Sequence, residues 1–270
     1  MEMPAEQLVI PDGLPDAVLE AIGDGVVVSL QHKHRGTRVF LLQCKKGWPF
    51  RLLNVADGSD PFGVLAEIDR LDWLDRRLPV PKVLASEPLP VGGHASVLAL
   101  PAGAVALSPE AVHGPPEIVE LFAKALRFVH EVPIDRCPFS NRLDIRLRSI
   151  QRKLRAGRYD EMQLSEAYRR YPPTRLFEIL NETRPNEEDL VFAHGAWHLR
   201  SVYLDAAGVS GIVDWDRAGV ADRYADLAMG AKVIADKISV ELVPLFFEAY
   251  GVPRPDPMRL DYYQLLAEFW

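Results

Sequence analysis

The sequence predicts an α+β fold in which a small N-terminal sheet region precedes a larger helical C-terminal region. Short segments rich in Val, Leu and Phe, separated by turn residues, occupy the N-terminal part and are typical of strands. Apolar residues at helical spacing dominate the rest of the chain. With 270 residues, the chain is long enough for two such regions. We place the boundary at Pro101–Gly103, a candidate hinge, which gives an N-terminal region of residues 1–101 and a C-terminal region of residues 102–270.

The composition disfavours several classes of protein. Lys and Arg number 31 against 38 Asp and Glu, and a net charge of −7 disfavours a general nucleic-acid binder. Hydrophobic residues make up 48% of the chain, which disfavours disorder. The longest apolar run, Ala95–Leu107, is broken by Pro101, and the N-terminus lacks leader features, so we expect a cytoplasmic protein with no membrane span. Cys44 and Cys137 lie far apart and are expected to be reduced thiols.

Three strands are predicted at the start of the N-terminal region. Gly25–Leu30 and Thr37–Gln43 have strand composition, and the polar segment Gln31–Gly36 between them suits a hairpin connection. Phe50–Val55 is expected to form the third strand, after a turn at Cys44–Trp48.

A helix is predicted next, followed by two more strands. Asp60 is a candidate N-cap, and Pro61 is favoured at the first helical position. Pro79 and Pro81 end the helical pattern. Apolar residues at three- and four-residue intervals mark the buried face of the helix: Leu65, Ile68, Leu71, Leu74 and Leu78. The two further strands are Val83–Ala85 and Ala95–Leu100.

Amphipathic helices make up most of the C-terminal region. The most regular one has apolar residues at positions i, i+3, i+4, i+7, i+8 and i+11, namely Ile118, Leu121, Phe122, Ala125, Leu126 and Val129. Further helices are expected at Ile145–Ala156, Arg175–Glu182, Tyr224–Lys237, Val240–Tyr250 and Leu260–Phe269. Short strands are expected among them at Val191–Ala193, Val202–Leu204 and Gly211–Val213.

The segment of residues 190–228 carries the most informative motifs. It contains a strand, a His194-Gly195 turn, a hairpin and the sequence Val213-Asp214-Trp215-Asp216. In this order and spacing it resembles the catalytic centre of the aminoglycoside phosphotransferases, most of all the class that phosphorylates the 3′-hydroxyl. Further segments resemble the same family: Glu67–Leu74 with the following Leu78–Pro81, Cys137–Phe139, Asp222–Ala228 and Leu265–Trp270.

The resemblance implies a two-lobed protein-kinase-like fold, with a small N-terminal sheet lobe and a larger helical C-terminal lobe. Family members carry a His-Gly-Asp turn whose Asp orients the attacking hydroxyl, and a later Asn that binds magnesium. Here these two positions hold Ala196 and Ser201. A methyl group cannot accept a proton, and losing a positioned base costs about 10²–10⁴-fold in rate. Asp214 matches the second metal-binding position, and Ser201 keeps an oxygen that could bind the same metal.

His198 and Asp214 are therefore the candidate catalytic residues. The imidazole of a histidine titrates near neutrality, which makes His198 a candidate general acid or base. Alternatively, His194, His198 and Asp214 would make a His/His/Asp metal site. In the family, however, the first His of this motif usually bonds to the backbone of the loop.

The nucleotide site is altered as well. The family pairs a Lys on the third strand with a Glu on the next helix, and these positions match Leu53, within about one residue, and Glu67. Arg51 shares the face of Leu53 if the strand alternates regularly, so it either replaces the Lys or lies at the solvent edge. Gln31–Gly36 has too few glycines for a phosphate cradle. We expect Mg²⁺ and ATP or GTP as cofactors only if some kinase function remains.

The candidate substrate-binding groups are Glu166, Glu268 and the terminal carboxylate of Trp270. The resemblance implies an acceptor cleft lined by carboxylates, because aminoglycosides are polycations. Tyr159–Ala167 is less acidic than its family counterpart, so we expect a ligand that is less cationic, or larger and more apolar. An ordinary solvated helix face would explain the same residues.

The coincident changes at Ala196, Ser201 and Leu53 favour a pseudokinase. Such a protein has lost ordinary kinase catalysis and binds a small molecule, a peptide or a protein partner. The alternative is a repurposed enzyme that modifies a natural product or a peptide in the old acceptor cleft, including slow or atypical ATP-dependent phosphotransfer. An ordinary resistance kinase is favoured least. The residues leave open whether the protein is an enzyme, and neither nucleic acid nor a membrane is expected as a partner.

Overall fold

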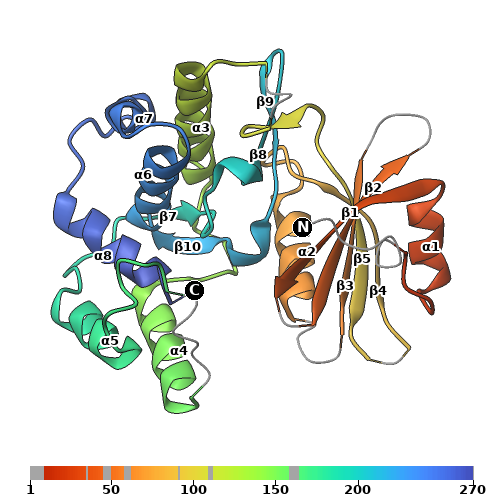
Figure 1. Ribbon diagram of the computed structural model, residues 1–270, viewed down its shortest axis with the longest axis horizontal. Coiled ribbons are helices and arrows are strands. Elements are labelled where there is room, and N and C mark those ends of the chain that lie inside the picture. The colour runs from red at the N-terminus through yellow and green to blue at the C-terminus, as the bar shows by residue number, and fades with distance from the viewer. Residues whose placement is uncertain are drawn as a thin grey trace. The chain divides into compact units, whose positions relative to one another are not determined.

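The chain divides into two compact units. The computed structural model describes residues 9–34, 36–44, 50–57, 62–90, 92–108, 112–157 and 164–269. The sheet unit contains Met1–Val112 and Arg200–Asp216, and the helical unit contains His113–Leu199 and Arg217–Trp270. One unit is built mainly on antiparallel strands and the other mainly on helices, which confirms the predicted α+β class (Figure 1).

The sheet unit is built on a five-stranded antiparallel sheet with the order β1-β2-β3-β5-β4. The predicted strands are all present, but β1 is longer than expected. Gln31–His34 was expected in a connection, yet it continues β1, which pairs with β2 as far as His34 opposite Thr37. A polar segment can continue a strand because the hydrogen bonds between strands are made by backbone groups. The strands are β1 (Gly25–His34), β2 (Thr37–Cys44), β3 (Arg51–Ala56), β4 (Lys82–Pro88) and β5 (His94–Ala99).

Two helices lie on opposite faces of this sheet (Figure 1). α2 (Phe62–Leu74) is the predicted helix, although its expected cap at Asp60 and Pro61 lies outside the described residues. α1 (Asp16–Ile22) was not predicted, because seven residues are too few for a periodic pattern. Its buried side chains pack against one face of the sheet in a cluster of Leu14, Val18, Ile22, Phe40, Leu42, Leu53, Val55, Ala95 and Val97.

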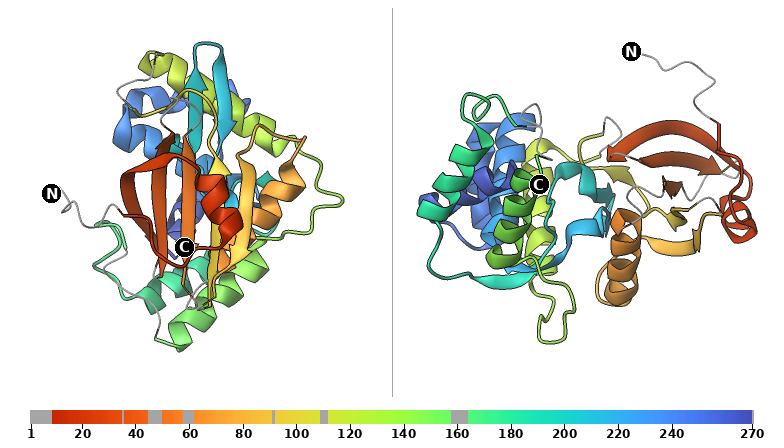
Figure 2. Two further views of the ribbon diagram at one scale, coloured as in Figure 1. Left: turned by 90° about the vertical axis from the view of Figure 1, so that its right-hand side faces the viewer. Right: turned by 90° about the horizontal axis from the view of Figure 1, so that it is seen from below.

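A second, three-stranded sheet brings a later segment of the chain into the sheet unit. β6 (Ala104–Val105) pairs with β8 (Val202–Asp205), which forms a hairpin with β9 (Gly208–Ile212), seen in teal in Figure 2. Gly103, at a φ of 87°, lies so close that a Cβ would overlap the carbonyl oxygen of Leu204. The boundary between the units therefore falls after Val112 rather than at Pro101–Gly103, because this pairing ties the expected hinge to the sheet unit.

The helical unit confirms the predicted helices and adds a strand. β7 (Leu190–Ala193) pairs with β10 (Gly219–Asp222), which was not predicted because it is only four residues long. The helices are α3 (Pro115–His130), α4 (Leu143–Arg155), α5 (Pro173–Glu182), α6 (Tyr224–Lys237), α7 (Val243–Tyr250) and α8 (Pro257–Ala267). None of the described helices is both long and apolar enough to cross a membrane.

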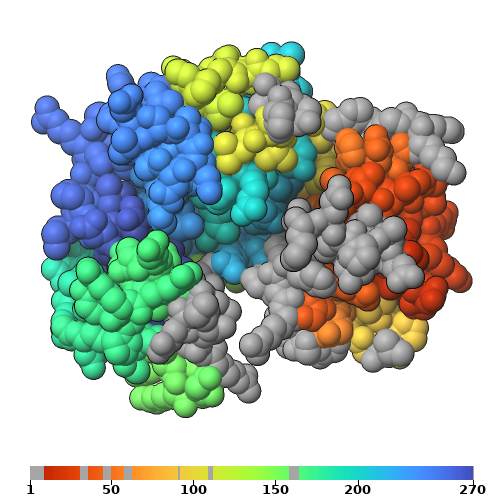
Figure 3. Space-filling view, in the orientation of Figure 1, coloured from red at the N-terminus to blue at the C-terminus, as the bar shows by residue number. Residues whose placement is uncertain are grey.

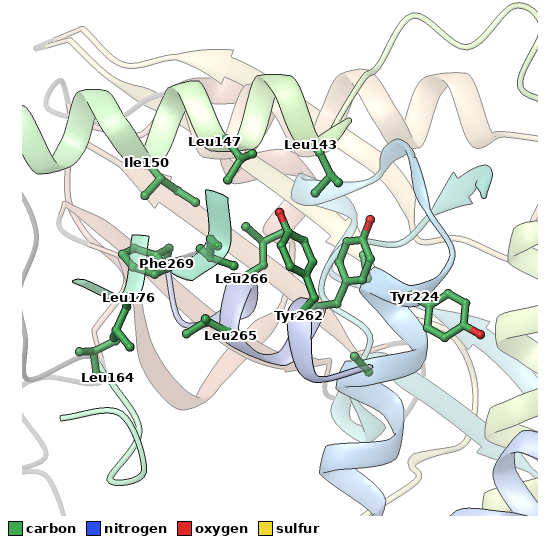
Figure 4. Packing of buried hydrophobic residues seen from close by; sticks show 14 residues of the cluster. Leu143, Leu147, Ile150, Leu164, Leu176, Tyr224, Tyr262, Leu265, Leu266 and Phe269 are labelled. Atoms are coloured by element: carbon green, nitrogen blue, oxygen red, sulfur yellow. The ribbon is translucent and has the colours of Figure 1, made fainter. Parts of the chain in front are cut away.

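The core of the helical unit positions α4 against the C-terminal helix. Leu143, Leu147 and Ile150 on α4 face the side chains of Tyr262 and Leu266 on α8 (Figure 4). The opposite side of α4 is exposed, and Figure 3 shows α4 and α5 in green at the surface of the unit. The apolar spacing in the sequence therefore decided which face of α4 is buried.

Candidate functional site

The His194–Ala196 turn follows β7 and is held by one buried carboxylate. Asp226 at the start of α6 accepts hydrogen bonds from the backbone N–H groups of His194, at 2.7 Å, and Gly195, at 2.8 Å. The backbone N–H of Ala196 donates to Nδ1 of His194 at 3.4 Å. The turn is therefore fixed through its backbone, and His194 acts as the structural histidine that the family resemblance implied.

Asp226 belongs to a buried hydrogen-bonded chain. Its Oδ2 lies 3.0 Å from Nε2 of His130, whose Nδ1 lies 2.7 Å from the hydroxyl of Tyr250. Burial by itself would raise the pKa of Asp226, but the hydrogen bond and charge of His130, the nearby His194 and the Gly195 N–H lower it below its usual value. Burial raises the pKa of Tyr250 to about 12. The sequence analysis quoted Asp226 only as part of a motif and did not identify it as the anchor of the turn.

The position of the missing carboxylate is well defined. Ala196 is half-buried and lies between Gly195, bonded to Asp226, and Trp197, which is fully buried. The ring of Trp197 stacks on Phe122 of α3 with centroids 4.9 Å apart. The turn is therefore anchored on both sides of Ala196, the position that the family resemblance assigns to the catalytic Asp.

Gly195→Ala is expected to destabilise the helical unit by several kcal/mol. A Cβ at this position would overlap the carbonyl oxygen of Arg217, and the φ of 82° is in the left-handed region. Backbone strain alone costs about 1–3 kcal/mol. Gly92→Ala is the matched control, because Gly92 has a φ of 87° and no atom within 4 Å of the added Cβ. Urea unfolding would compare the two variants, and equal losses of stability would contradict the close approach at Gly195.

Ser201 and Asp214 come together within the sheet unit. The backbone N–H of Val213 donates to the carbonyl of Ser201 at 2.9 Å. Asp214 has a φ of 66°, which is uncommon outside glycine and clusters at functional sites. Burial and the charge of Asp214 raise the pKa of Tyr203 on β8 to about 12. The carboxylate therefore lies near the β8–β9 hairpin, which directly follows Ser201.

The Ser201 hydroxyl and the Asp214 carboxylate are the predicted magnesium ligands, and both supply oxygen donors. Mg²⁺ prefers oxygen ligands and usually binds one or two protein groups together with water and phosphate. The Ser201 hydroxyl and the Asp214 carboxylate supply that number, and the ion would neutralise phosphate charge there. Within the described parts of the chain, no group of three or more His, Cys, Asp or Glu side chains is arranged to hold a metal.

Arg51 does not replace the phosphate-binding Lys. Its Nη1 donates to the carbonyls of Ala21, at 2.7 Å, and Ile22, at 3.0 Å, at the end of α1. Leu53, on the same face of β3, packs in the α1 cluster. The alternation is as predicted, but this face turns towards α1 and away from α2 (Figure 1). Arg51 therefore closes the C-terminal end of α1, as basic side chains often do.

The opposite face of β3 also lacks a Lys. It presents Leu52 and Asn54, and Nδ2 of Asn54 donates to Oγ of Ser96 at 3.4 Å. Glu67 of α2 is 6% exposed, and its Oε1 accepts a hydrogen bond of 3.4 Å from the backbone N–H of Trp215. Glu67 therefore bonds to the backbone beside Asp214, with no lysine ammonium supplied by β3.

The structure brings two of the predicted substrate-binding groups into one region. Glu166 is exposed, and its neighbour Ser165 donates its backbone N–H to Oε2 of the half-buried Glu268 at 2.7 Å. Trp270 and Tyr159–Gln163 lie outside the described residues. His198 is half-buried, two residues after Ala196, and its role as an acid or base stays a prediction.

Comparisons with known proteins identify the family of this chain. The profile of the phosphotransferase enzyme family, APH, matches residues 36–263. An aminoglycoside 3′-phosphotransferase from Niallia circulans is 33% identical over 258 residues, covering 95% of this chain and 97% of that protein. Another, from Streptomyces fradiae, is 34% identical over 222 residues, which cover 80% of this chain and 82% of that protein. The crystal structure of an aminoglycoside-3′-phosphotransferase of type VIII has a TM-score of 0.80 at 28% identity and covers 94% of this chain and 98% of that one.

These matches extend through both units and include the turn, the hairpin and the Asp214 segment. They confirm the predicted family and its kinase-like fold. The chain therefore belongs to the phosphotransferase enzyme family and is similar over nearly its whole length to aminoglycoside 3′-phosphotransferases.

Proposed function

We propose that this protein is a ligand-binding pseudokinase that has lost ordinary phosphoryl transfer. The observation that carries the proposal is Ala196, a methyl group at the centre of a turn whose backbone is held by Asp226 and Trp197. Without a carboxylate there, no side chain at that position takes the proton of an attacking hydroxyl. The ligand is a small molecule or a peptide, and a protein partner is an alternative occupant.

Two further positions support the loss of catalysis. Ser201 offers a shorter oxygen donor than an Asn, and β3 carries Leu52, Leu53 and Asn54 where the family resemblance implies a Lys. The turn itself keeps a fixed conformation, because the buried Asp226 accepts hydrogen bonds from the backbone N–H groups of His194 and Gly195. A scaffold kept without its catalytic groups suits binding better than turnover.

A repurposed enzyme is the second candidate, and Asp214 is the observation that favours it. This carboxylate is retained at a φ of 66°, and Glu67 still bonds to the backbone next to it. Such an enzyme would modify a natural product or a peptide, or transfer phosphate slowly. Asp214→Ala would abolish that activity but would leave ligand binding in the helical unit intact.

Phosphotransfer assays provide the main test. With ATP or GTP, Mg²⁺ and a panel of aminoglycosides, we expect no product above the uncatalysed background. Turnover that depends on the intact protein and is lost in Asp214→Ala would contradict the pseudokinase proposal and establish the enzyme instead.

Thermal unfolding with nucleotide separates the two candidates further. If the dissociation constant for the nucleotide is above about 1 mM, then 1 mM nucleotide raises the free energy of unfolding by less than about 0.5 kcal/mol. The Tm then rises by roughly 1 °C. A kinase-like site with a dissociation constant near 10 μM would raise the free energy of unfolding by about 2.7 kcal/mol, which raises the Tm by roughly 5–10 °C. We expect the small shift with ATP, GTP and Mg²⁺, and the large one would favour the repurposed enzyme.

A further inference from the structure

A pocket lies at one end of the five-stranded sheet, on the side that α1 covers. Its described lining comes from the segment Pro11–Leu14 before α1, from the ends of β2 and β3, and from the turn between β4 and β5. The volume is about 510 Å³. Small-molecule sites usually have volumes of about 300–1,000 Å³, so this pocket has the size of a ligand site.

The floor of the pocket is apolar. Leu14 and Val55, which are 7% and 5% exposed, belong to the hydrophobic cluster between α1 and the sheet, and Leu89 packs against the same cluster. All three residues line the pocket. The pocket therefore opens onto the core of the sheet unit, and an apolar group placed on this floor is removed from water, which stabilises binding.

Backbone hydrogen bonds hold the walls of the pocket in place. The N–H of Asp57, directly after β3, donates to the carbonyl of Gly36 at 2.8 Å and so joins the start of β2 to the end of β3. In the turn between β4 and β5, the N–H of Gly92 donates to the carbonyl of Leu89 at 3.0 Å, and the N–H of Leu89 donates to the carbonyl of Gly93 at 3.2 Å. The pocket is therefore formed without a ligand, as most small-molecule sites are.

The charged residues of the described lining are Asp12, Arg38 and Asp57. Arg38 is exposed on β2, and its guanidinium lies 5.7 Å from the centroid of the Phe40 ring. With the described residues Arg38 forms no hydrogen bond or ion pair, whereas Asp57 interacts with other groups of the chain. Asp12 is exposed in the segment before α1. One cation and one exposed acid are therefore placed at the edge of an apolar floor.

We propose that this pocket binds a zwitterionic small molecule with an apolar side chain, which is the chemistry of a free amino acid. The carboxylate of the ligand pairs with the guanidinium of Arg38, and its ammonium pairs with the carboxylate of Asp12. The apolar side chain covers the floor. A ligand with only one of the two charges leaves the other residue without a partner. The described lining includes no residue of the His194–Ala196 turn, so this site goes beyond the proposed pseudokinase function and does not depend on it.

Calorimetric titration of the full chain with L-tryptophan and L-leucine tests the proposal. Indolepropionate, which lacks the ammonium group, and tryptamine, which lacks the carboxylate, are the comparison probes. We expect the tighter of the two amino acids to bind with a dissociation constant of about 0.1–1 mM, which is usual for a ligand of this size. Each comparison probe should bind about 10-fold more weakly than L-tryptophan, because it loses one charge-assisted hydrogen bond.

Variants of the two charged residues show whether the pocket is the binding site. Arg38→Gln should weaken the binding of L-tryptophan about 10–100-fold and leave that of tryptamine unchanged. Asp12→Asn should weaken the binding of L-tryptophan and leave that of indolepropionate unchanged. Lys82→Gln is the matched control, because Lys82 is exposed on β4 and lies outside the described lining.

Three results would overturn this site. The first is that neither amino acid binds at about 10 mM. The second is that tryptamine and indolepropionate bind as tightly as L-tryptophan. The third is that Arg38→Gln binds L-tryptophan as tightly as Lys82→Gln does. None of these results depends on phosphoryl transfer, so the pocket and the pseudokinase proposal can fail separately.

Discussion

Ala196→Asp is expected to raise ATP-dependent phosphoryl transfer above the uncatalysed background, because a positioned base contributes about 10²–10⁴-fold to the rate. The new carboxylate would stand on a turn whose backbone Asp226 and Trp197 already hold, so no rearrangement of the loop is required. Ala196 is half-buried, which leaves a charged side chain partly in water and keeps its desolvation cost low.

The rate would be measured as phosphate transferred to each aminoglycoside of a panel, with hydrolysis of ATP followed in parallel. Ala206→Asp is the control, because it adds the same charge at an exposed position between β8 and β9. Ser201→Asn added to Ala196→Asp should raise the rate again by restoring the longer metal ligand. Equal rates in the unmodified protein and in Ala196→Asp would mean that the missing carboxylate is not what limits catalysis.

Asp226→Asn is expected to lower the free energy of unfolding by about 3–5 kcal/mol, because it removes the charge of a buried carboxylate on which several hydrogen bonds converge. The substitution removes the charge that faces His130 and weakens the acceptor of two backbone N–H groups. Urea unfolding at pH 7 measures the loss. Asp236→Asn is the control, because Asp236 forms an exposed i,i+4 pair with Lys232 that is worth only about 0.3–0.5 kcal/mol.

The loss of unfolding free energy in Asp226→Asn should depend on pH in a defined direction. The folded-state pKa of Asp226 lies below its usual value, so the ionised carboxylate stabilises the fold fully above the unfolded pKa of about 3.9. That contribution disappears as the pH falls through the lower folded-state pKa. The difference in the free energy of unfolding between the unmodified protein and Asp226→Asn should therefore shrink below about pH 4. A gap that instead widened in acid would contradict the ionised, hydrogen-bonded state of Asp226.

Local patterns in the sequence were sufficient for most elements of the fold. The regular apolar spacing around Phe122 and the start of α6 at Tyr224 predicted helices that the structure contains, because such spacing buries one helix face wherever the helix packs. The order of motifs from the His194-Gly195 turn to Asp214 predicted the family, which the comparisons confirm. The presence of Ala196 where the family resemblance implies a catalytic acid is likewise read from the sequence alone.

Contacts between distant segments decided what these patterns left open. Strand alternation placed Arg51 and Leu53 on one face, but only the packing of α1 determined that this face turns away from α2. The anchoring of the turn by Asp226 joins residues 32 positions apart in the chain. Local residue preferences determine which helices and strands form, whereas side chains far apart in the chain become neighbours only after the hydrophobic core has packed.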